Sequence, residues 1–556
     1  MSANVGTMEN IGAVGDVDKH PKGLYALFAT EMWERFSFYS MLALFTLYLQ
    51  DPTQGFGWTP AQATGLYANY LMFVYASPLI GGLIADKVTG YRKAVMIGGV
   101  FFILGHGLLS IPAMWAVYAA LTCLVIGNGF FKPNVSTMVG NLYPEGSGMK
   151  DRAYNIFYMG INVGAFAAPI VMEIVKAYAG FHAAFAVAAF GMVISVAILW
   201  FFKDTVEGTN KNPLRSAEQA ADAAATAVDA PPHGISHQDE GGNTAANTAR
   251  QERMNAVPDS KRIMALIVIF LIVIVFWMVF HQNGSTLTYW ADDNTAWDVS
   301  GTISNAINPF WIITLTFPLV WFWGWLNKRG LEPATPTKMA IGMFLTAMSF
   351  FVLYFAATVG EGKTATPEQL AAGSFRINER VLTNLRADGV PEDALQKIAT
   401  AKNPDGKFVV MDKKFPYEAE QNGVKAKVTL TDELAKVIPA SQATQYQNQF
   451  LQRGYLFQVS PFWLILAYAI ISLGELMLSP MGLSLVSKVA PIKVRGLMMG
   501  GWFVATAIGN KLTMIGIYWS IWYQSNFFII LGLMALVMSV VLFLLLKPLK
   551  RAMPGV

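Results

Sequence analysis

The sequence is poor in charged residues and in cysteine. Only 14% of its 556 residues are Asp, Glu, Lys or Arg, whereas 54% are hydrophobic, a balance that excludes an ordinary soluble protein. The single cysteine, Cys123, permits no intrachain disulfide and no cysteine-based metal site. The polar, mildly acidic start of the chain, up to Asp18, lacks the basic-then-apolar layout of a cleaved signal peptide. We therefore expect an integral membrane protein whose first helix inserts without cleavage.

Apolar stretches long enough to cross a bilayer recur through the chain. In its first part they cover residues 24–49, 60–86, 93–111, 113–140, 153–178 and 181–202. In its second part they cover residues 263–290, 301–326, 338–359, 459–487, 495–519 and 525–547. The sequence therefore predicts an all-α integral membrane fold of twelve transmembrane helices in two six-helix halves.

The polar intervals divide the chain. We expect a cytoplasmic N-terminal tail at 1–23, a first bundle at 24–202, a cytoplasmic linker at 203–261, a second bundle at 262–548 and a cytoplasmic tail at 549–556. A further polar interval, 360–458, interrupts the second bundle between its third and fourth helices. Patterns at 378–402 are typical of amphipathic helices, and residues 403–406 of a turn that leads into a strand at 407–411. This interval predicts a small, at least partly folded insertion.

Basic residues of the short loops lie on one side of the predicted topology, which indicates the cytoplasmic face. They are Lys19, Lys22, Lys87, Arg92, Lys93, Lys150, Arg152, Lys328, Arg329, Lys338, Lys488, Lys493, Arg495, Lys547, Lys550 and Arg551. The short loops of the other side, 51–60, 110–113, 291–300 and 519–526, contain no Lys or Arg, and Lys176 is the main exception near that face. We therefore expect a plasma (inner) membrane protein with both termini in the cytoplasm and the insertion outside.

Three ionisable residues interrupt the first predicted helix. Glu31, Glu34 and Arg35 lie at i, i+3 and i+4, and Tyr39 lies one turn further, so a helix places all four on one face. Arg35 would lie roughly 16 Å from the helix start, near the middle of a hydrocarbon layer about 30 Å thick. A lone charge at that depth is costly, so this face is predicted to look into the bundle or a watery cavity. A buried ion pair that only pins helices together is the alternative.

Two further ionisable residues lie inside predicted spans. Lys132 lies at about the depth of Glu31 and Glu34, so it can form a pair whose protonation is switchable; its long stem could instead reach the membrane surface. Glu475 lies near the middle of the tenth helix. With Arg35 and Lys132 in one half and Glu475 in the other, a cavity between the halves would be dipolar and would suit a zwitterion. A neutral, hydrogen-bonded Glu475 is the alternative.

Neutral polar and aromatic side chains could line the same cavity, namely Tyr70, Asn162, Asn308, Ser479 and Trp502. An asparagine offers two donors and an acceptor, which a peptide group needs from its surroundings. Taken singly, each Asn or Tyr is more typical of a helix-to-helix contact or of an interfacial aromatic than of a ligand contact. The spans contain no metal-ligand cluster and no nucleophile with a base, so we do not expect an enzyme.

Five motifs together resemble the proton-coupled oligopeptide transporter (POT) family of the major facilitator superfamily. They are ExxERFxxY at Glu31–Tyr39, GGxxAD at Gly81–Asp86, KPN at Lys132, FYxxINxG at Phe157–Gly164 and GExxxSPxG at Gly474–Gly482. The resemblance covers essentially the whole membrane part. It implies that Glu31 and Glu34 take part in proton coupling, and that Arg35 and Lys132 pair with them and receive the peptide carboxylate.

The same resemblance implies that Glu475 holds the amino group of the substrate. Asn162 and Asn308 would meet the peptide backbone, and the aromatic side chains would shape the side-chain pockets; these are Tyr39, Tyr70 and Trp502. It further implies a protein without a cofactor, with H⁺ as the coupling ion and a di- or tripeptide as substrate. We expect it to act as a monomer in the bilayer, without nucleic acid.

Two positions depart from the family pattern. Leu42 stands where the family usually has Arg, and His281, just before Gln282, stands where it commonly has an acidic residue. In the family these two positions are expected to pair across the halves as an outer gate. Because histidine titrates in the physiological range, we hypothesise that His281 takes over proton sensing. A neutral histidine, hydrogen-bonded within the bundle, is the alternative.

The sequence as a whole predicts a symporter that imports di- and tripeptides with protons by alternating access between its halves. Two other functions fit the same fold. One is a proton-coupled carrier of another small anion or amino acid, and the other is a peptide sensor that does not transport.

Overall fold

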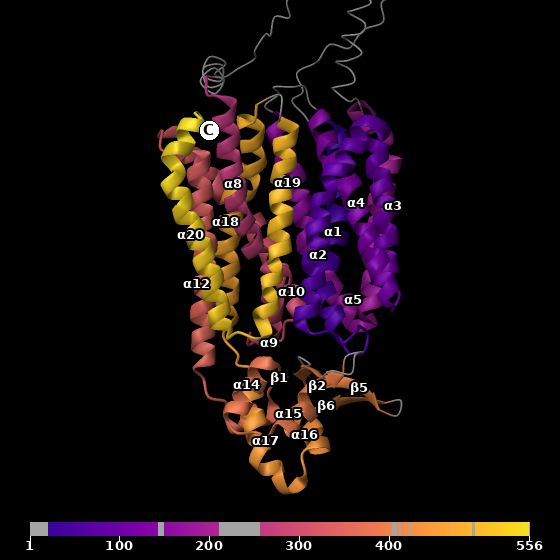
Figure 1. The fold of residues 1–556 in the computed structure, drawn as a ribbon. Helices are drawn as coiled ribbons and strands as arrows, with labels where there is room; N and C mark the ends of the chain where they lie inside the picture. Colours follow the sequence, from indigo (N-terminus) through magenta and orange to yellow (C-terminus); the bar gives the residue numbers. More distant parts are fainter. Residues whose placement is uncertain are drawn as a thin grey trace, which may run out of the picture.

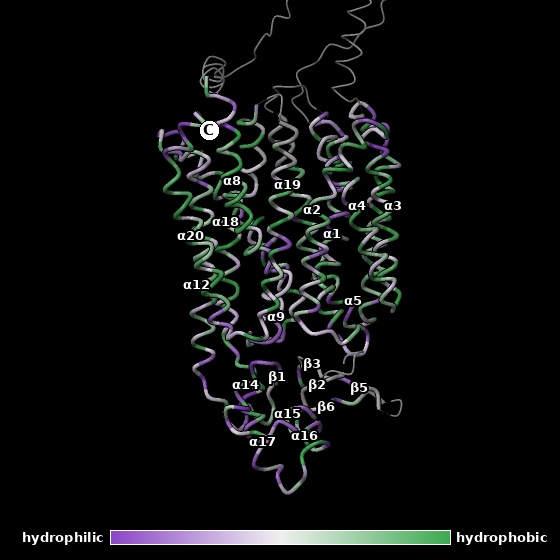
Figure 2. Tube along the Cα trace, in the orientation of Figure 1, coloured by the Kyte–Doolittle hydropathy of each residue, from purple (hydrophilic) through white to green (hydrophobic). Residues whose placement is uncertain are grey.

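The computed structural model describes residues 20–142, 149–210, 256–402, 408–410, 413–421, 424–491 and 495–554. The predicted N-terminal tail up to residue 19, residues 211–255 of the predicted linker and the predicted turn at 403–406 lie outside these ranges. Long helices run side by side through the bundle, and apolar residues dominate their middle parts (Figures 1 and 2).

The first half consists of α1 (Lys22–Gln50), α2 (Pro60–Ile84), α3 (Tyr91–Leu108), α4 (Met114–Asn141) and α5 (Met149–Phe201). A π-helical turn follows α2 (Ala85–Thr89), and a 3₁₀ segment follows α5 (Lys203–Asn210). α5 contains two helices joined at Gly180, whose φ of 80° lies in the left-handed region that glycine adopts most easily. Just beyond it, the Phe181 amide donates to the Gln54 side chain at 2.8 Å, which caps the second helix. In its described residues, 20–142 and 149–210, the first half therefore has six membrane helices.

The second half begins with α8 (Asp259–Phe280), a 3₁₀ turn η3 (His281–Gly284) and α9 (Thr286–Asp293), which together form one interrupted helix. It continues with the short α10 (Gly301–Ser304), then α11 (Ile307–Lys328), α12 (Thr335–Glu361) and α18 (Pro461–Val489). The last helices are α19 (Arg495–Leu512), extended by the 3₁₀ segment η5 (Thr513–Ser520), and α20 (Gln524–Ala552). Counting α10 with α11, the described part of this half also contains six membrane helices.

Eight helical stretches in the described part of the chain are long and apolar enough to cross a membrane by themselves. One of them, Ile156–Phe201, holds the two helices that meet at Gly180. Three other membrane helices, α1, α3 and α19, are not among these eight stretches, and each of the three carries charged residues. These charges lower the mean hydropathy of the three helices, although each helix is long enough to span the membrane.

The insertion between α12 and α18 is a small α+β unit. Its helices are α13 (Pro367–Ala372), α14 (Glu379–Ala387), α15 (Glu392–Ala399), α16 (Leu430–Val437) and α17 (Ala440–Gly454). Its strands are β1 (Phe375–Ile377), β2 (Thr400–Lys402), β3 (Phe408–Val410), β4 (Lys413–Phe415), β5 (Tyr417–Gln421) and β6 (Val424–Val428), paired antiparallel as β1–β4, β2–β3 and β5–β6.

This unit has a hydrophobic core of its own, which includes Phe375, Leu382, Leu385, Phe415 and Phe450. α14 and α15 lie in the stretch predicted to form amphipathic helices, and β3 lies in the stretch predicted to form a strand. Figure 1 shows the unit beyond the end of the bundle that carries α9, opposite the C-terminus.

Each half also has its own core, and the two halves meet along α2 with α19 and along α5 with α10 and α11. The Thr64 and Tyr289 hydroxyls lie 3.4 Å apart across this boundary, and Lys511 of α19 donates to the Asn69 side chain of α2. Gly284 lies so close to Tyr67 that a Cβ would fall 1.9 Å from the tyrosine oxygen. These contacts hold the halves together toward the end that carries the insertion.

Candidate substrate and proton site

An ionic cluster occupies the middle of α1. Glu31, Glu34 and Arg35 are each at most 2% exposed. The Arg35 Nη2 donates to Glu34 Oε1 at 2.5 Å, and its Nε contacts the second oxygen of the same carboxylate. Glu31 Oε1 lies 3.4 Å from the same Nε, while Glu31 Oε2 has no hydrogen-bond partner among the described residues. Glu34 is therefore fixed by a bidentate pair, and Glu31 keeps one oxygen free for a proton or a ligand.

Close packing of α1 on α5 orients this cluster. A Cβ at Gly164 would fall 2.3 Å from the Met32 carbonyl oxygen, and one at Gly160 would fall 2.9 Å from the Phe28 ring. The two glycines, spaced by four, let the helix backbones approach, as small residues do in membrane interfaces. Ser37 adds a hydrogen bond from its hydroxyl to the Ala188 carbonyl at 2.8 Å. This tight contact fixes the rotation of α1 about its own axis and so the direction of Arg35.

Lys132 points to an aromatic side chain. Its Nζ lies 4.5 Å from the centroid of the Tyr75 ring, a cation–π distance. No ion pair within 4 Å joins Lys132 to Glu31 or Glu34 in the described part of the chain, although it interacts electrostatically with both. The predicted Lys–Glu pair is therefore present as a longer-range interaction rather than as a contact.

Tyr75 also faces the second half. Its ring centroid lies 5.8 Å from that of His281, which stacks on Trp277 at 5.2 Å and 23°. His281 is 8% exposed, and its Nε2 has no hydrogen-bond partner among the described residues. Lys132, Tyr75 and His281 thus form a row that crosses from one half to the other.

In the second half, α11 and α18 bring Asn308 and Glu475 together. The Asn308 amide donates to Glu475 Oε2 at 3.1 Å and to the Ser472 hydroxyl at 2.9 Å. Glu475 interacts electrostatically with Tyr39, Tyr75 and Tyr158 of the first half. The carboxylate therefore lies within electrostatic range of tyrosines of the first half.

The other predicted site residues lie in different surroundings. Trp502 is 3% exposed and packs in the core of the second half, against Gly482 and the Phe270 ring. The Asn162 amide donates to the Tyr158 carbonyl of its own helix at 2.9 Å. Tyr70 is 2% exposed, and its hydroxyl has no partner in the described part of the chain. Ser479 is partly buried on α18, one turn beyond Glu475.

Sequence reasoning missed Tyr75, Tyr158 and Ser472. A tyrosine in an apolar helix carries no signal that separates a site residue from an interfacial one, and Ser472 precedes Glu475 by less than one turn without any distinguishing motif. The spacing of Ser472 and Glu475, i and i+3, was the available signal, because it places both on one helix face.

Two six-helix halves that enclose buried charges of opposite sign define a secondary transporter of the major facilitator type. The sequence model described as the POT family matches residues 92–378 and 434–525, and the chain belongs to that family. The predicted fold class and family resemblance are thereby confirmed. The match skips residues 379–433, which lie in the insertion.

Similar proteins agree with this assignment. The chain is 26% identical to the di-/tripeptide transporter of Lactococcus lactis subsp. cremoris, over 96% of this chain and 97% of that protein. It is also 26% identical to the uncharacterized transporter YclF of Bacillus subtilis (strain 168), over 97% and 96%. The crystal structure of a mutant of peptide transporter POT in complex with alafosfalin has a TM-score of 0.67 and 26% identity, covering 96% of both chains. The protein is thus a multi-pass membrane transporter.

Proposed function

We propose that this protein is a proton-coupled symporter that imports di- and tripeptides by alternating access. One observation carries the proposal: Arg35, a cationic group of the first half, is buried, and Glu475, an anionic group of the second half, is partly buried on the other side of the boundary between the halves. Tyr39 and Tyr75 interact electrostatically with both of these groups. A free peptide carries one charge of each sign at its two ends, so it complements this arrangement.

In this proposal each end of the peptide binds a charged group of opposite sign. The peptide carboxylate competes with Glu31 and Glu34 for Arg35 and is also attracted by Lys132. The ammonium group binds Glu475, whose carboxylate is held in place by Asn308. Asn162 serves the peptide backbone, and the pockets are shaped by Tyr39, Tyr70, Ser479 and Trp502. Trp502 acts from within the core of the second half, through α18.

Proton coupling follows from the unequal contacts of the two glutamates. Glu34 binds Arg35 through both of its oxygens, whereas Glu31 makes one longer contact and keeps one oxygen free. Protonation of Glu31 would weaken its attraction for Arg35 and make the guanidinium available to the peptide carboxylate. Glu31 is therefore the proton acceptor and Glu34 the residue that holds Arg35 in place.

His281 is the second titratable group of the proposal. It lies at the 3₁₀ turn between α8 and α9, and Tyr75 separates it from Lys132. A proton on the imidazole would place a second cation next to Lys132, and like charges repel. Protonation of His281 would thus push apart two elements of opposite halves, which links the proton to the opening of the boundary.

The distribution of basic loop residues supports a plasma (inner) membrane location with both termini in the cytoplasm. In this proposal the insertion, and the end of the bundle at which the halves meet, lie on the outside. The protein would work as a monomer, since each chain holds both halves of the site.

Counterflow in proteoliposomes tests this function. Liposomes loaded with di-alanine should take up labelled di-alanine, and an inward proton gradient should drive its accumulation. Uptake that depends on a small anion or a single amino acid and is indifferent to Glu475→Gln would favour the other carrier, and peptide binding without flux would favour the sensor. Absence of both binding and flux with peptides would refute the proposal.

A further inference from the structure

Two adjacent carboxylates end α9, at the side of the bundle that carries the insertion. Asp292 and Asp293 are the last residues of this helix, and Asp293 is 2% exposed. Negative charge is unfavourable at a helix C-terminus, where the partial charge of the helix dipole is also negative. The end of α9 therefore needs compensating cations.

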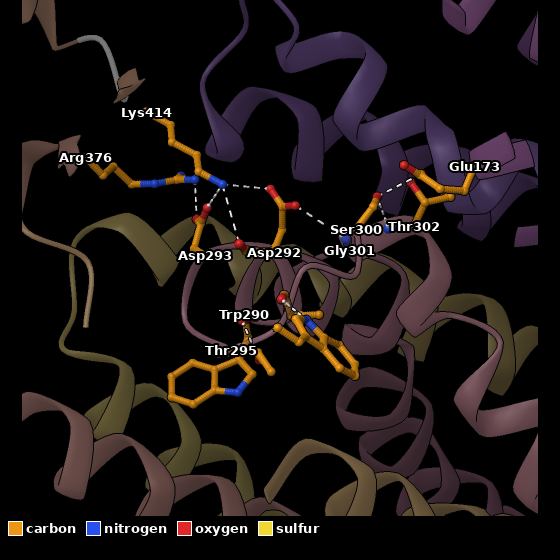
Figure 3. Close-up of polar contacts among 12 residues, drawn as sticks. Glu173, Trp290, Asp292, Asp293, Thr295, Ser300, Gly301, Thr302, Arg376 and Lys414 are labelled. Carbon is orange, nitrogen blue, oxygen red and sulfur yellow. Dashed lines mark hydrogen bonds and ion pairs between the residues drawn. The ribbon is translucent and has the colours of Figure 1, made fainter. Parts of the chain in front are cut away.

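The insertion supplies them. Lys414 Nζ lies 3.0 Å from Asp292 Oδ2 and 2.9 Å from Asp293 Oδ1, and Arg376 Nη2 contacts Asp293 Oδ2 (Figure 3). Burial by itself would lower the pKa of Lys414, but Asp293 and Asp292 outweigh this effect, and its pKa is raised. Both carboxylates are thus neutralised by residues from a different part of the chain.

The two cations require the carboxylates in return. Arg376 of β1 and Lys414 of β4 are directly opposite each other in the antiparallel pair, and like charges in that position are destabilising. Two unfavourable pairs, one of anions and one of cations, therefore become one favourable cluster only when the insertion lies against α9. Other ion pairs of the insertion, Arg386–Glu392 and Arg453–Asp388, are more exposed and remain within the insertion itself.

From this cluster a chain of polar contacts continues to the first half. Asp292 Oδ1 accepts a long hydrogen bond of 3.4 Å from the Gly301 amide, at the start of α10. Next to it, the Ser300 hydroxyl donates to Glu173 Oε2 of α5 at 2.8 Å. Lys176 of α5 pairs with Glu173 at 2.6 Å, and its Nζ donates to Ser300 Oγ at 3.3 Å and to Thr302 Oγ1 at 3.4 Å.

The backbone reinforces this connection. The chain leaving the insertion pairs with the segment after α9, where the Val459 amide donates to the Asn294 carbonyl at 2.9 Å. The Asn294 side chain donates to the Phe457 carbonyl at 3.1 Å. The segment between α9 and α10 is therefore held by the insertion on one side, and its end, Ser300, touches the opposite half on the other.

We propose that Arg376 and Lys414 are positioning residues of the outer gate: they fix the end of α9, so that Ser300 and Thr302 meet Glu173 and Lys176 and close the transporter on the insertion side. This rests on the proposed function for its place in a transport cycle. It gives the insertion a role in the closing step, and it explains the basic Lys176 on a side of the molecule otherwise poor in basic loop residues.

Accessibility of a buried reporter tests the proposal directly. Thr64 is fully buried where α2 meets Tyr289 of the other half, so Thr64→Cys, in a Cys123→Ala background, should react with an impermeant maleimide only when the halves separate on the insertion side. In the double variant Arg376→Gln/Lys414→Gln the labelling rate should rise about fivefold or more, in the range of typical coupling between sites. The charge-conserving variant Arg376→Lys/Lys414→Arg should stay close to the parent.

A matched control removes two cations that the insertion pairs internally. Arg386→Gln/Arg453→Gln should label at the rate of the parent protein. Lys414→Gln alone retains the more buried Arg376–Asp293 pair, so its labelling rate should increase by less than that of the double variant. This single variant replaces the double variant in the test if the double variant does not fold. Equal labelling rates in the parent, Lys414→Gln and any folded double variant would overturn the proposal.

Transport kinetics provide a second readout. A weaker closed state raises the fraction of molecules open to the outside, so the KM for external peptide should fall in Arg376→Gln/Lys414→Gln. A purely structural effect would instead lower the amount of folded protein and leave the KM unchanged. If the parent protein transported no peptide, the proposed function would fail, while the labelling rates would still decide whether these residues hold the gate.

Discussion

At the scale of single residues, the unequal contacts of the two glutamates of α1 predict that their variants differ. Glu31→Gln should abolish uptake driven by a proton gradient and retain peptide counterflow, because the peptide site remains while the proton acceptor is lost. Glu34→Gln should lower the stability of the folded protein by about 3–5 kcal/mol, since it breaks a buried bidentate ion pair. Uptake assays and thermal unfolding in detergent measure the two effects. The assignment would be reversed if Glu34→Gln were the stable, uncoupled variant.

The same residues show how much of the site the sequence could predict. The spacing of Glu31, Glu34 and Arg35 predicted one charged helix face, because helical periodicity fixes which residues are neighbours. It could not predict that Arg35 binds Glu34 bidentately and Glu31 singly, since that depends on side-chain rotamers and on the contact of α1 with α5. Nor could it predict Tyr75, whose position between Lys132 and His281 depends on three helices from two halves.

A histidine at the boundary predicts a pH effect. An unperturbed imidazole titrates within the physiological pH range, so if His281 senses protons, peptide uptake should lose its pH dependence in His281→Gln. His182→Gln is the control, because this histidine lies near the Gly180 kink and contacts the Gln54 carbonyl at 3.1 Å. An unchanged pH profile in His281→Gln would show that this residue is a neutral part of the bundle.

If Glu475 binds the amino group of the peptide, substituting Glu475 should change the selectivity for peptides with a free N-terminus. The intact protein should prefer a free dipeptide over its N-acetylated form by about tenfold or more, because a buried carboxylate left unpaired costs free energy. Glu475→Gln should reduce this preference, mainly by weakening binding of the free peptide. Competition assays with the two peptides measure it. Equal preference in the parent and in Glu475→Gln would remove Glu475 from the substrate site.

At the scale of helices, hydropathy predicted where the chain crosses the membrane and missed where the helices break. The turn from His281 to Ser285 and the split between α10 and α11 interrupt stretches that are continuous in hydropathy. Such breaks depend on tertiary contacts, and one of them is visible at Gly284, where the Tyr67 hydroxyl occupies the space of a side chain. The topology of the insertion was also beyond prediction, since its strands are short and pair through distant residues.

The close contact between Gly284 and Tyr67 predicts that a larger residue at position 284 keeps the two halves from closing on the insertion side. In Gly284→Ala the new Cβ would fall 1.9 Å from the Tyr67 oxygen, and the two residues belong to different halves. Peptide uptake should therefore fall steeply, and Thr64→Cys should label faster from the outside. Tyr67→Ala should partly restore uptake in the double variant, because it removes the clashing ring. A double variant no better than Gly284→Ala alone would mean that the glycine serves the local turn instead.

At the scale of the whole molecule, the direction of transport depends on which end of the bundle faces the cytoplasm. The basic loop residues gather at the end opposite the insertion, where Lys328 ends α11, Arg329 follows it and Arg551 lies near the C-terminus. Lys176, at the other end, is paired with Glu173, so its charge does not weaken the asymmetry. By the positive-inside rule we therefore expect the insertion on the outer side of the membrane.

Cysteine labelling in intact cells checks this orientation. In a Cys123→Ala background, Thr383→Cys on the exposed face of α14 should react with an impermeant maleimide added outside, whereas Lys328→Cys should react only after the membrane is permeabilised. Both positions are solvent-exposed in the structure, so a difference in rate reports the side of the membrane and not burial. The opposite pattern would place the insertion in the cytoplasm. The contacts between the halves would then close the cytoplasmic side. The structure would represent the opposite state of the same proton-coupled cycle.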